Sequence, residues 1–403
     1  MLNDLVLVLN CGSSSVRFSV LNPVNEEVYL SGLIDKLYLS ESCIEWTRKH
    51  EKNRLIIGDN VSHFESLHFL IENVFKKYSY LLSNITAIGH RVVHGGMSLN
   101  KTTIVNKDVI EEIKKNIVFA PLHNPINLLG IQAALEYFPH LSKKNVIVLD
   151  TAFYKKMPES SYLYAIPYNF YKKYNIRRYG AHGISHYYVV KEAAKILNIN
   201  MNCLNVISCH LGGGSSVTVF RNGICVDTSM GLTPLEGLVM GTRSGDIDPS
   251  IIFFLNNVVK MSINDIQDLL MYKSGILGLN NGITSDFRYV ERNYQHELGA
   301  NRAINIFCHR LSKYISSYTT LLNGKLDGII FTGGIGANSS LVRRITLSKL
   351  SMFGIKINNQ LNNIMSMGRC GFIERYNTIP LLVIPTNEEL VIAKQTIKIL
   401  KEF

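Results

Sequence analysis

Residues 5–20 read Leu-Val-Leu-Val-Leu-Asn-Cys-Gly-Ser-Ser-Ser-Val-Arg-Phe-Ser-Val. An apolar run leads into a short polar segment of Gly and Ser, and a run of alternating apolar and polar residues follows it. This pattern predicts a strand, a tight turn and a second strand. Hydroxyl groups, backbone N–H groups bared by glycine and a cation on the departing strand, Arg17, are what a phosphate needs. A Walker loop is disfavoured, because it would open a helix at this point. Taken alone, a Gly-Ser turn between strands is more often only a turn.

The same plan recurs about two hundred residues later, in residues 206–220. There an apolar run enters Gly212-Gly213-Gly214 and a second run leaves it, with Ser215-Ser216-Val217 aligned to Ser14-Ser15-Val16 and Gly213 aligned to Gly12. Two such tips predict a duplicated domain, with the phosphates of a nucleotide held between the copies.

Composition predicts a two-domain soluble protein. A chain of 403 residues is longer than one hydrophobic core usually supports. A composition of 46% hydrophobic and 18% charged residues is typical of a globular protein. The chain starts without a basic leader and has no apolar run of spanning length, so we expect a cytoplasmic protein that does not enter a membrane. The net charge of +11 is dispersed in short Lys pairs, which favours a solvated surface over a nucleic-acid partner. Small anionic substrates would also suit this charge.

The seven cysteines are odd in number and scattered, and none of them forms a C-x-x-C pair. This pattern predicts neither disulfides nor structural zinc, and we expect the cysteines to be small apolar fillers.

The first half of the chain places two charged residues at strand ends. Residues 29–57 predict a continued antiparallel sheet, and apolar residues at helical spacing in 64–75 predict a helix packed on it. A short strand then delivers Arg91 into a Gly-rich loop, where it needs an anionic partner. The strand 146–149 ends at Asp150, which either anchors Mg²⁺ or water or merely caps the next turn.

The second half carries polar segments that structure alone does not require. His182 lies between glycines on a loop, and Ser185 is placed to cap the following helix. Residues 226–249 form a long Gly-punctuated excursion that contains Arg243, which suggests function. The strand 326–331 breaks into a Gly-rich turn before a helix, and this turn suits a ribose or an α-phosphate although it lacks the third glycine of a dinucleotide fingerprint. Glu388 opens the last helix as a helix-dipole partner or a metal ligand.

These blocks, in this order and over almost the entire length, resemble the acetate and propionate kinase family of the actin, Hsp70 and sugar-kinase superfamily. The blocks that match family motifs are residues 10–15, 90–96, 120–125, 150–153, 177–183, 227–249, 285–288, 331–336 and 385–389. The resemblance implies an α/β fold with two duplicated actin-like (ribonuclease H-like) domains and the nucleotide and acid site in the cleft between them. Residues 1–150 and 385–403 would form the first domain, residues 151–384 would form the second, and the protein would be a homodimer.

The resemblance also implies an activity, the reversible transfer of a phosphoryl group from Mg-ATP to acetate, giving acetyl phosphate and ADP. Mg²⁺, with Mn²⁺ as an alternative, would be the cofactor. The implied catalytic residues are Arg91, Asp150, His182 and Arg243, and Asn10 and Glu388 would join Asp150 in setting the metal and its waters. The acetate methyl would be lined by Val93, Leu122, Ala181 and Pro234 beside Arg91. The nucleotide would be held by Arg17, His210, Leu211, Gly212, Gly213, Gly214, Asp286, Phe287, Arg288, Gly333, Gly334, Ile335, Gly336 and Asn338.

Elementary chemistry agrees with this implied activity. Acetate is already ionised near pH 7 and attacks without a general base, so the task is to align two anions and offset their repulsion. Two arginines, a histidine and Mg²⁺ suit that task. Replacing Arg91 or Arg243 by Ala is therefore expected to lower turnover on the order of a thousandfold and to leave the fold intact.

The chain departs from the usual family pattern at a few positions. Arg17 stands where Lys is usual, and Ala181 replaces a frequent Phe, which widens the acyl pocket and leaves room for propionate. Tyr154 replaces His, Gly213 replaces Asn and Ala337 replaces Glu. The last two put nucleotide affinity in question more than the chemistry.

Other functions stay open beside the implied one. The nearest alternative is a propionate or longer short-chain acid kinase, and another is a nucleotide-binding protein that has lost catalysis. A sugar kinase is disfavoured because a hydroxyl acceptor needs an Asp base. A nucleic-acid binder rests only on net charge.

Overall fold

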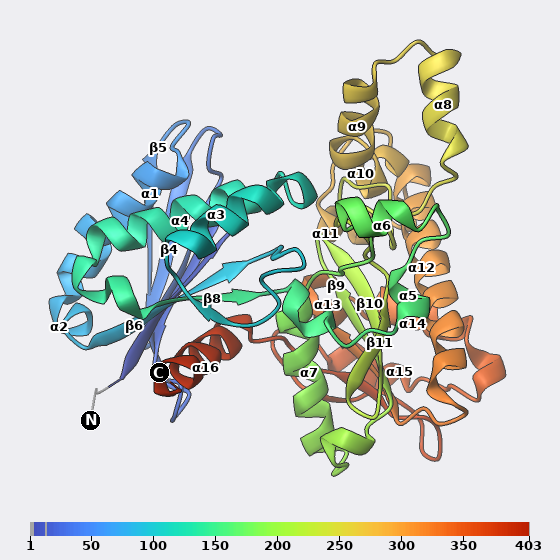
Figure 1. The fold of residues 1–403 in the computed structure, drawn as a ribbon. Helices are drawn as coiled ribbons and strands as arrows, with labels where there is room; N and C mark the ends of the chain where they lie inside the picture. Colours follow the sequence, from blue (N-terminus) through green and yellow to red (C-terminus); the bar gives the residue numbers. More distant parts are fainter. Residues whose placement is uncertain (1–3, 13, 403) are drawn as a thin grey trace. The chain divides into compact units, whose positions relative to one another are not determined.

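The structure is a computed structural model that describes residues 4–12 and 14–402, so Ser13 of the first hairpin tip lies outside the described residues. The chain divides into two compact units (Figure 1). Unit 1 comprises residues 1–155 and 387–403, and unit 2 comprises residues 156–386. The boundaries expected from the sequence fall a few residues earlier in the chain.

Unit 1 is built on an eight-stranded sheet with the order β5-β4-β3-β2-β1-β6-β8-β7. The strands from β1 to β5 pair antiparallel, β1, β6 and β8 run parallel, and β7 is antiparallel to β8. The bounds are β1 Leu5–Cys11, β2 Val16–Leu21, β3 Val28–Asp35, β4 Ser42–Arg48, β5 Glu51–Gly58, β6 Ile85–Val92, β7 Thr103–Ile104 and β8 Asn145–Leu149. The strand-turn-strand prediction for residues 5–20 is confirmed.

Unit 2 repeats this plan in a six-stranded sheet with the order β11-β10-β9-β12-β14-β13. Its pairs follow the same directions as β3-β2-β1-β6-β8-β7, including the short antiparallel edge strand that precedes its neighbour in the chain. The bounds are β9 Val206–Leu211, β10 Ser215–Arg221, β11 Ile224–Thr228, β12 Gly328–Thr332, β13 Gly371–Phe372 and β14 Leu381–Val383. The predicted duplication and the mixed α/β class are confirmed at the level of topology.

Helices cover both faces of the unit 1 sheet (Figure 1). Leu5, Leu7 and Leu9 pack in a core with α1 and α4, where Gly130 lets α4 approach closely, since a Cβ there would lie 2.6 Å from Cys11 Sγ. On the other face α16 crosses β6 so closely that a Cβ at Gly89 would lie 2.7 Å from Ile392 Cγ2. The helices are α1 His63–Phe69, which continues as a π-helix Leu70–Phe75, then α2 Ser79–Leu82, α3 Lys107–Lys115, α4 Asn124–Tyr137 and α16 Glu388–Lys401.

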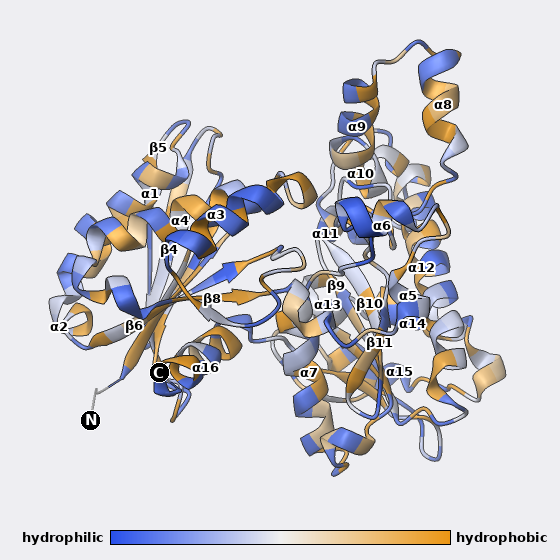
Figure 2. Ribbon diagram, in the orientation of Figure 1, coloured by the Kyte–Doolittle hydropathy of each residue, from blue (hydrophilic) through white to orange (hydrophobic). Residues whose placement is uncertain are grey.

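The core of unit 2 lies between its sheet and α12. The apolar stripe that the sequence predicts, at Ile304, Phe307, Cys308, Leu311 and Ile315, is buried there, and Figure 2 shows apolar residues along the central strands of both units. The helices are α5 Glu159–Tyr162, α6 Asn169–Tyr174, α7 Gly183–Ile196, α8 Ser250–Asn257, α9 Ile263–Tyr272, α10 Gly275–Leu279, α11 Phe287–Arg292, α12 Leu298–Thr319, α13 Gly333–Asn338, α14 Ser340–Ser348 and α15 Asn359–Ile364. Among the described residues, no helix has the length and apolar character needed to cross a membrane.

Three local predictions are wrong. Ser185 does not cap α7, because the helix already begins at Gly183 and the Ser185 hydroxyl bonds His210 Nδ1 at 2.7 Å instead. The Gly-rich run after β12 is not a turn before a helix but forms α13 itself. Of the seven cysteines, Cys203 and Cys370 are exposed and fill no core.

A buried histidine makes unit 1 sensitive to acid. His90 Nε2 lies 2.8 Å from Asn145 Oδ1, and burial lowers the pKa of His90 from 6.5 to about 4 although this hydrogen bond opposes the shift. Because the folded pKa is below the unfolded one, the stabilisation is complete above pH 6.5 and is lost as the pH falls toward 4.

We therefore predict that between pH 7 and pH 5 the wild type loses roughly 2 kcal/mol more unfolding free energy than His90→Gln. Urea titrations of both proteins at the two pH values measure this difference. Equal losses in the two proteins would show that His90 does not take up a proton on unfolding.

Candidate active site

In unit 1, four polar side chains meet where the parallel strands end. Asn10, Arg91 and Asp150 come from the carboxyl ends of β1, β6 and β8, and Glu388 is the first residue of α16. Arg91 Nη1 donates to Asn10 Oδ1 at 3.2 Å, and Asn10 Nδ2 lies 3.5 Å from Glu388 Oε2. Carboxyl ends of parallel strands share one edge of a sheet, which is why residues so far apart in sequence come together.

The strongest contact in this group is the ion pair of Arg91 with Asp150. Asp150 is fully buried, and its Oδ2 accepts from Arg91 Nε at 3.1 Å and from Nη2 at 2.6 Å. Burial lowers the pKa of Arg91, but the charges of Asp150, Glu388 and Glu389 outweigh burial and raise it. The anionic partner predicted for Arg91 therefore includes a carboxylate of the protein itself.

The carboxyl group of Glu388 has a strongly raised pKa. Burial raises its pKa to about 7, the charges of Asp150 and Glu389 add to the shift, and Arg91 and Arg17 oppose it. Arg91 Nε lies 3.9 Å from Glu388 Oε2. The positive charge of Arg91 and Arg17 thus only partly balances the carboxyl groups of Asp150, Glu388 and Glu389.

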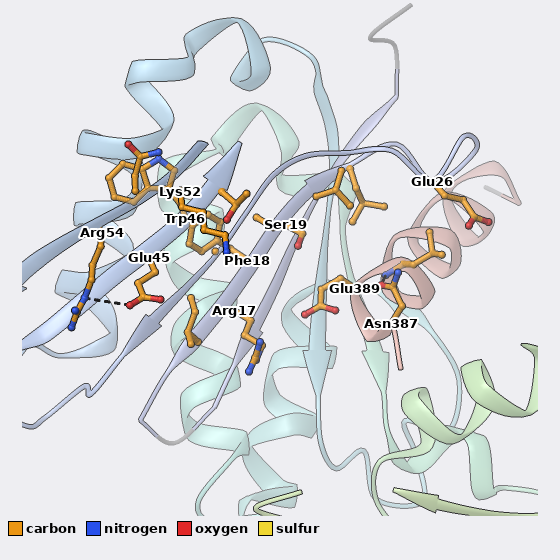
Figure 3. A pocket seen from close by; sticks show the side chains of 18 residues that line it. Arg17, Phe18, Ser19, Glu26, Glu45, Trp46, Lys52, Arg54, Asn387 and Glu389 are labelled. Carbon is orange, nitrogen blue, oxygen red and sulfur yellow. Dashed lines mark hydrogen bonds and ion pairs between the residues drawn. The ribbon is translucent and has the colours of Figure 1, made fainter. Parts of the chain in front are cut away.

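Arg17 lies next to Asn10, because these residues are opposite each other in the register of β1 and β2. Its side chain is exposed at the wall of a hollow of about 690 Å³, which lies on the sheet beside the start of α16. Asn387 and Glu389 from the start of α16 line the same hollow (Figure 3).

In unit 2, the hairpin tip Gly212–Gly214 lies against two other backbone segments. Gly241 N donates to Gly213 O at 2.9 Å, and Gly212 faces the backbone of Gly334. Gly333 has a φ of +76°, and a Cβ there would lie 2.5 Å from Leu211 O, so only glycine fits at the start of α13. At Gly213 and Gly334 no described atom lies within 4 Å of a Cβ position, which leaves these backbones open to a ligand.

His182 and Arg243 both lie beside Gly214. A Cβ on this glycine would lie 3.2 Å from His182 Nε2 and 3.5 Å from Arg243 Nη2. Arg243 Nη1 donates to Pro234 O at 2.8 Å, and burial lowers the pKa of Arg243. The His182 and His210 rings stack with centroids 4.2 Å apart. The structure thus brings together His182, His210, Arg243 and the glycine tip.

The four residues expected to line an acyl pocket belong to both units. Val93 is buried and Leu122 is half-buried in unit 1, while Ala181 and Pro234 are buried in unit 2. Ala181 packs with Met230 and Met240. That the four residues line one pocket stays a prediction.

The residues expected to hold the nucleotide differ in how accessible their side chains are to a ligand. Asp286 caps α11, and its Oδ1 and Oδ2 each accept from the Arg288 guanidinium at 3.0 Å. The ring of Phe287 packs on Phe307 in the core, with centroids 5.6 Å apart, so only its main chain can serve a nucleotide. Leu211 and Gly336 are likewise buried, whereas Asn338 is exposed and its Nδ2 donates to Gly334 O at 2.9 Å. Ile335 is half-buried within α13.

A partly buried network that the sequence analysis missed anchors the loop before Arg243. Arg178 Nη2 donates to Glu236 Oε1 at 2.7 Å, and its Nη1 donates to Thr228 O at 2.9 Å. The Tyr164 hydroxyl bonds Glu236 and accepts from Leu232 N at 2.8 Å. The Arg177-Arg178 doublet and the lone Glu236 in a Gly-rich loop were the available signals, but 58 positions separate Arg178 from Glu236.

These groups define a class of protein that handles oxyanions. Guanidinium, amide and carboxyl groups of unit 1, and guanidinium, imidazole and open backbone of unit 2, suit binding of phosphate and carboxylate groups. The sequence profile of the acetokinase family matches residues 5–394. The chain belongs to the acetokinase family.

Known relatives are similar over the whole length. The acetate kinase of Buchnera aphidicola subsp. Schizaphis graminum is 56% identical over 400 residues, which cover 99% of each chain. The acetate kinase of Escherichia coli strain K12 is 53% identical over 394 residues, or 98% of each chain. Among solved structures, a propionate kinase from Francisella tularensis subsp. tularensis SCHU S4 has a TM-score of 0.90 at 43% identity, covering 97% of this chain and 98% of that one. An acetate kinase from Porphyromonas gingivalis has a TM-score of 0.87 at 36% identity, covering 98% and 100%.

The ion pair changes the expectation that Arg91→Ala leaves the fold intact. Without the guanidinium, Asp150 stays buried without its main counter-charge, and we predict a loss of roughly 3–5 kcal/mol of unfolding free energy at pH 7. Arg243→Ala removes a hydrogen bond to a main-chain oxygen and should cost only about 1 kcal/mol. Urea titrations of the two variants make the comparison.

The double variant Arg91→Ala/Asp150→Asn is the matched control, because it also removes the buried charge. It should recover part of the stability lost in Arg91→Ala. Equal stabilities of Arg91→Ala and Arg243→Ala would contradict the role of the ion pair.

Proposed function

We propose that this protein is an acetate kinase that transfers a phosphoryl group reversibly between ATP and acetate, giving acetyl phosphate and ADP. The observation that carries the proposal is 56% identity to an acetate kinase over 99% of the chain. Arg91, His182 and Arg243 support it, since their side chains supply the positive charge and the N–H groups that phosphoryl transfer between two anions needs.

In the proposed reaction, the carboxylate oxygen of acetate attacks the terminal phosphorus in line with the leaving ADP oxygen. No residue has to remove a proton, because acetate is ionised near pH 7. Arg91 and Arg243 act on the same transferred phosphoryl group, and His182 donates an N–H to one of its oxygens. Asp150 holds the Arg91 guanidinium in place through the ion pair at 2.6 Å. The open backbones of Gly213 and Gly334 serve the nucleotide.

We propose Mg²⁺ as the cofactor, with Mn²⁺ as a substitute. When bound, the metal neutralises charge on the nucleotide phosphates. Asn10, Asp150 and Glu388 would hold it, directly or through water. Oxygen donors suit Mg²⁺, and a cation would stabilise the ionised form of Glu388, whose pKa burial raises to about 7. Among the described residues, no cluster of three His, Cys, Asp or Glu side chains forms a metal cage, which agrees with an ion held largely by substrate phosphates and water.

We also propose that the protein is a homodimer in the cytoplasm. The supporting feature is α8, which has no buried residue and contains several hydrophobic residues, coloured orange in Figure 2. Phe253 is 65% exposed, Phe254 57% and Val258 61%. Large apolar surfaces of this kind mark protein contacts.

A propionate kinase is the second candidate. Ala181 favours it, since a small side chain there leaves more room for an acyl chain. Met230 and Met240, which pack against Ala181, oppose it by occupying part of the space that an aromatic residue would fill.

The proposal is tested by ATP-dependent formation of acyl phosphate, trapped as hydroxamate, with acetate, propionate and butyrate side by side. We predict the highest kcat/KM on acetate, and a fall in kcat of about a thousandfold in Arg243→Ala. Arg344→Ala, at an exposed position on α14, is the matched control and should keep full activity.

A preference for propionate would move the assignment to the second candidate. No product from any acid, with ATP still bound, would mean a nucleotide-binding protein without catalysis. A loss of only a few fold in Arg243→Ala would refute the role of this arginine.

The raised pKa of Glu388 predicts pH-dependent metal binding. A cation needs the ionised carboxylate, so a proton competes with the metal below a pH of about 7. Calorimetric titration with Mn²⁺ alone should show about tenfold tighter binding at pH 8 than at pH 6. Glu388→Gln should bind weakly and equally at both pH values. The same affinity of the wild type at both pH values would contradict this prediction.

A further inference from the structure

His182 is the first member of a chain of four hydrogen-bonded side chains in unit 2. His182 Nδ1 lies 3.0 Å from Ser216 Oγ, Ser216 Oγ lies 2.8 Å from His186 Nε2, and His186 Nδ1 lies 2.8 Å from Ser208 Oγ. Ser208, Ser216 and His186 are fully buried. The chain therefore runs from a proposed catalytic group into the interior of the unit.

Secondary structure explains how these residues meet. His182 and His186 are four positions apart at the start of α7 and lie on one face of the helix. Ser208 on β9 and Ser216 on β10 are diagonal neighbours in the register of these strands, in which Ser216 is opposite His210. His210 stacks on the ring of His182, and Arg243 Nη2 lies on the same side of Gly214 as His182 Nε2. The His182 ring is thus held on one face and at Nδ1.

The buried members make packing alone a poor explanation. Two hydroxyl groups and an imidazole between a helix and a sheet cost free energy that apolar side chains would not. Both ring nitrogens of His186 are hydrogen-bonded to hydroxyl groups. Burial, helped by the charge of His210, lowers the pKa of His186 well below its ordinary range, which keeps this ring neutral.

A neutral imidazole has one donor and one acceptor, so the chain can run in two directions. In the first, Ser208 donates to His186 Nδ1, His186 Nε2 donates to Ser216, and Ser216 donates to His182 Nδ1. This direction puts the proton of neutral His182 on Nε2. In the second, His182 Nδ1 donates to Ser216, and all later bonds reverse, which suits protonated His182. A protonated His182 carries a proton on Nε2 in the second direction, whereas a neutral His182 would then carry its only proton on Nδ1.

We propose that the chain runs in the first direction while His182 is neutral, so that Ser216 and His186 are positioning residues that make His182 present an N–H at Nε2, beside Gly214, in both of its charge states. The inference rests on the proposed function, in which that N–H donates to an oxygen of the transferred phosphoryl group. A donor of fixed direction stabilises charge that develops in the transition state without reorganisation.

The test compares Ser216→Ala with two controls. Thr218→Val removes another buried hydroxyl from the same strand, one that bonds Thr228 Oγ1 at 2.8 Å and does not contact His182 in the chain. Ser216→Thr keeps the hydroxyl at position 216. For Ser216→Ala we expect kcat with acetate to fall by roughly tenfold to hundredfold while the KM values change little. Thr218→Val and Ser216→Thr should remain near the wild type.

The second readout is independent of activity. NMR of protein with ¹⁵N-labelled histidine reports which nitrogen of His182 carries the proton. The wild type should hold the Nε2–H tautomer above the pKa of His182, and Ser216→Ala should show a mixture of both tautomers. A wild type without kinase activity but with this tautomer would refute the proposed function and keep the positioning role. An unchanged tautomer in Ser216→Ala, or equal losses of kcat in Ser216→Ala and Thr218→Val, would overturn the inference.

Discussion

The buried ion pair between Arg91 and Asp150 is the constraint on which the rest of unit 1 depends. Asp150 is fully buried and accepts from Arg91 at 2.6 Å, so each charge is tolerated only because the other is present. This requirement keeps the ends of β6 and β8 in register and leaves Arg91 Nη1 to bond Asn10 on β1. The same pair leaves Glu388 short of positive charge, which is the physical basis for expecting a cation there.

In unit 2, separate segments are brought together by close backbone contacts instead of a buried ion pair. Its hairpin tip, α13 and the loop before Arg243 approach one another closely because glycines stand at the contacts. In these segments the backbones of Gly213 and Gly334 are open to a ligand, so glycine permits both the close packing and the approach of an oxyanion. The network of Arg178 with Glu236 then fixes the loop that carries Pro234, and Pro234 O in turn holds Arg243.

In both units the candidate site residues lie on the same arrangement of strands. Two antiparallel strands, three parallel strands and a short antiparallel edge strand recur in the same order in each sheet. Duplication explains why the hairpin that carries Asn10 and Arg17 has a counterpart in unit 2. That counterpart carries His210 and the glycine tip. The units differ in what was added, since β4 and β5 extend only the first sheet and the 22-residue α12 belongs only to the second unit.

The sequence by itself determined the two hairpins, the mixed α/β class, the main strands and the family, because alternation, helical spacing and Gly-Ser knots are local patterns. It also predicted Arg91, His182 and Arg243 as site residues from their places beside glycines and strand ends. Only the tertiary structure decided that Arg91 binds Asp150, that Arg178 binds Glu236, and that Ser185 bonds His210 instead of capping α7. These contacts join residues 25 to 59 positions apart. They depend on strand register and on how closely helices approach the sheet, which no local pattern specifies.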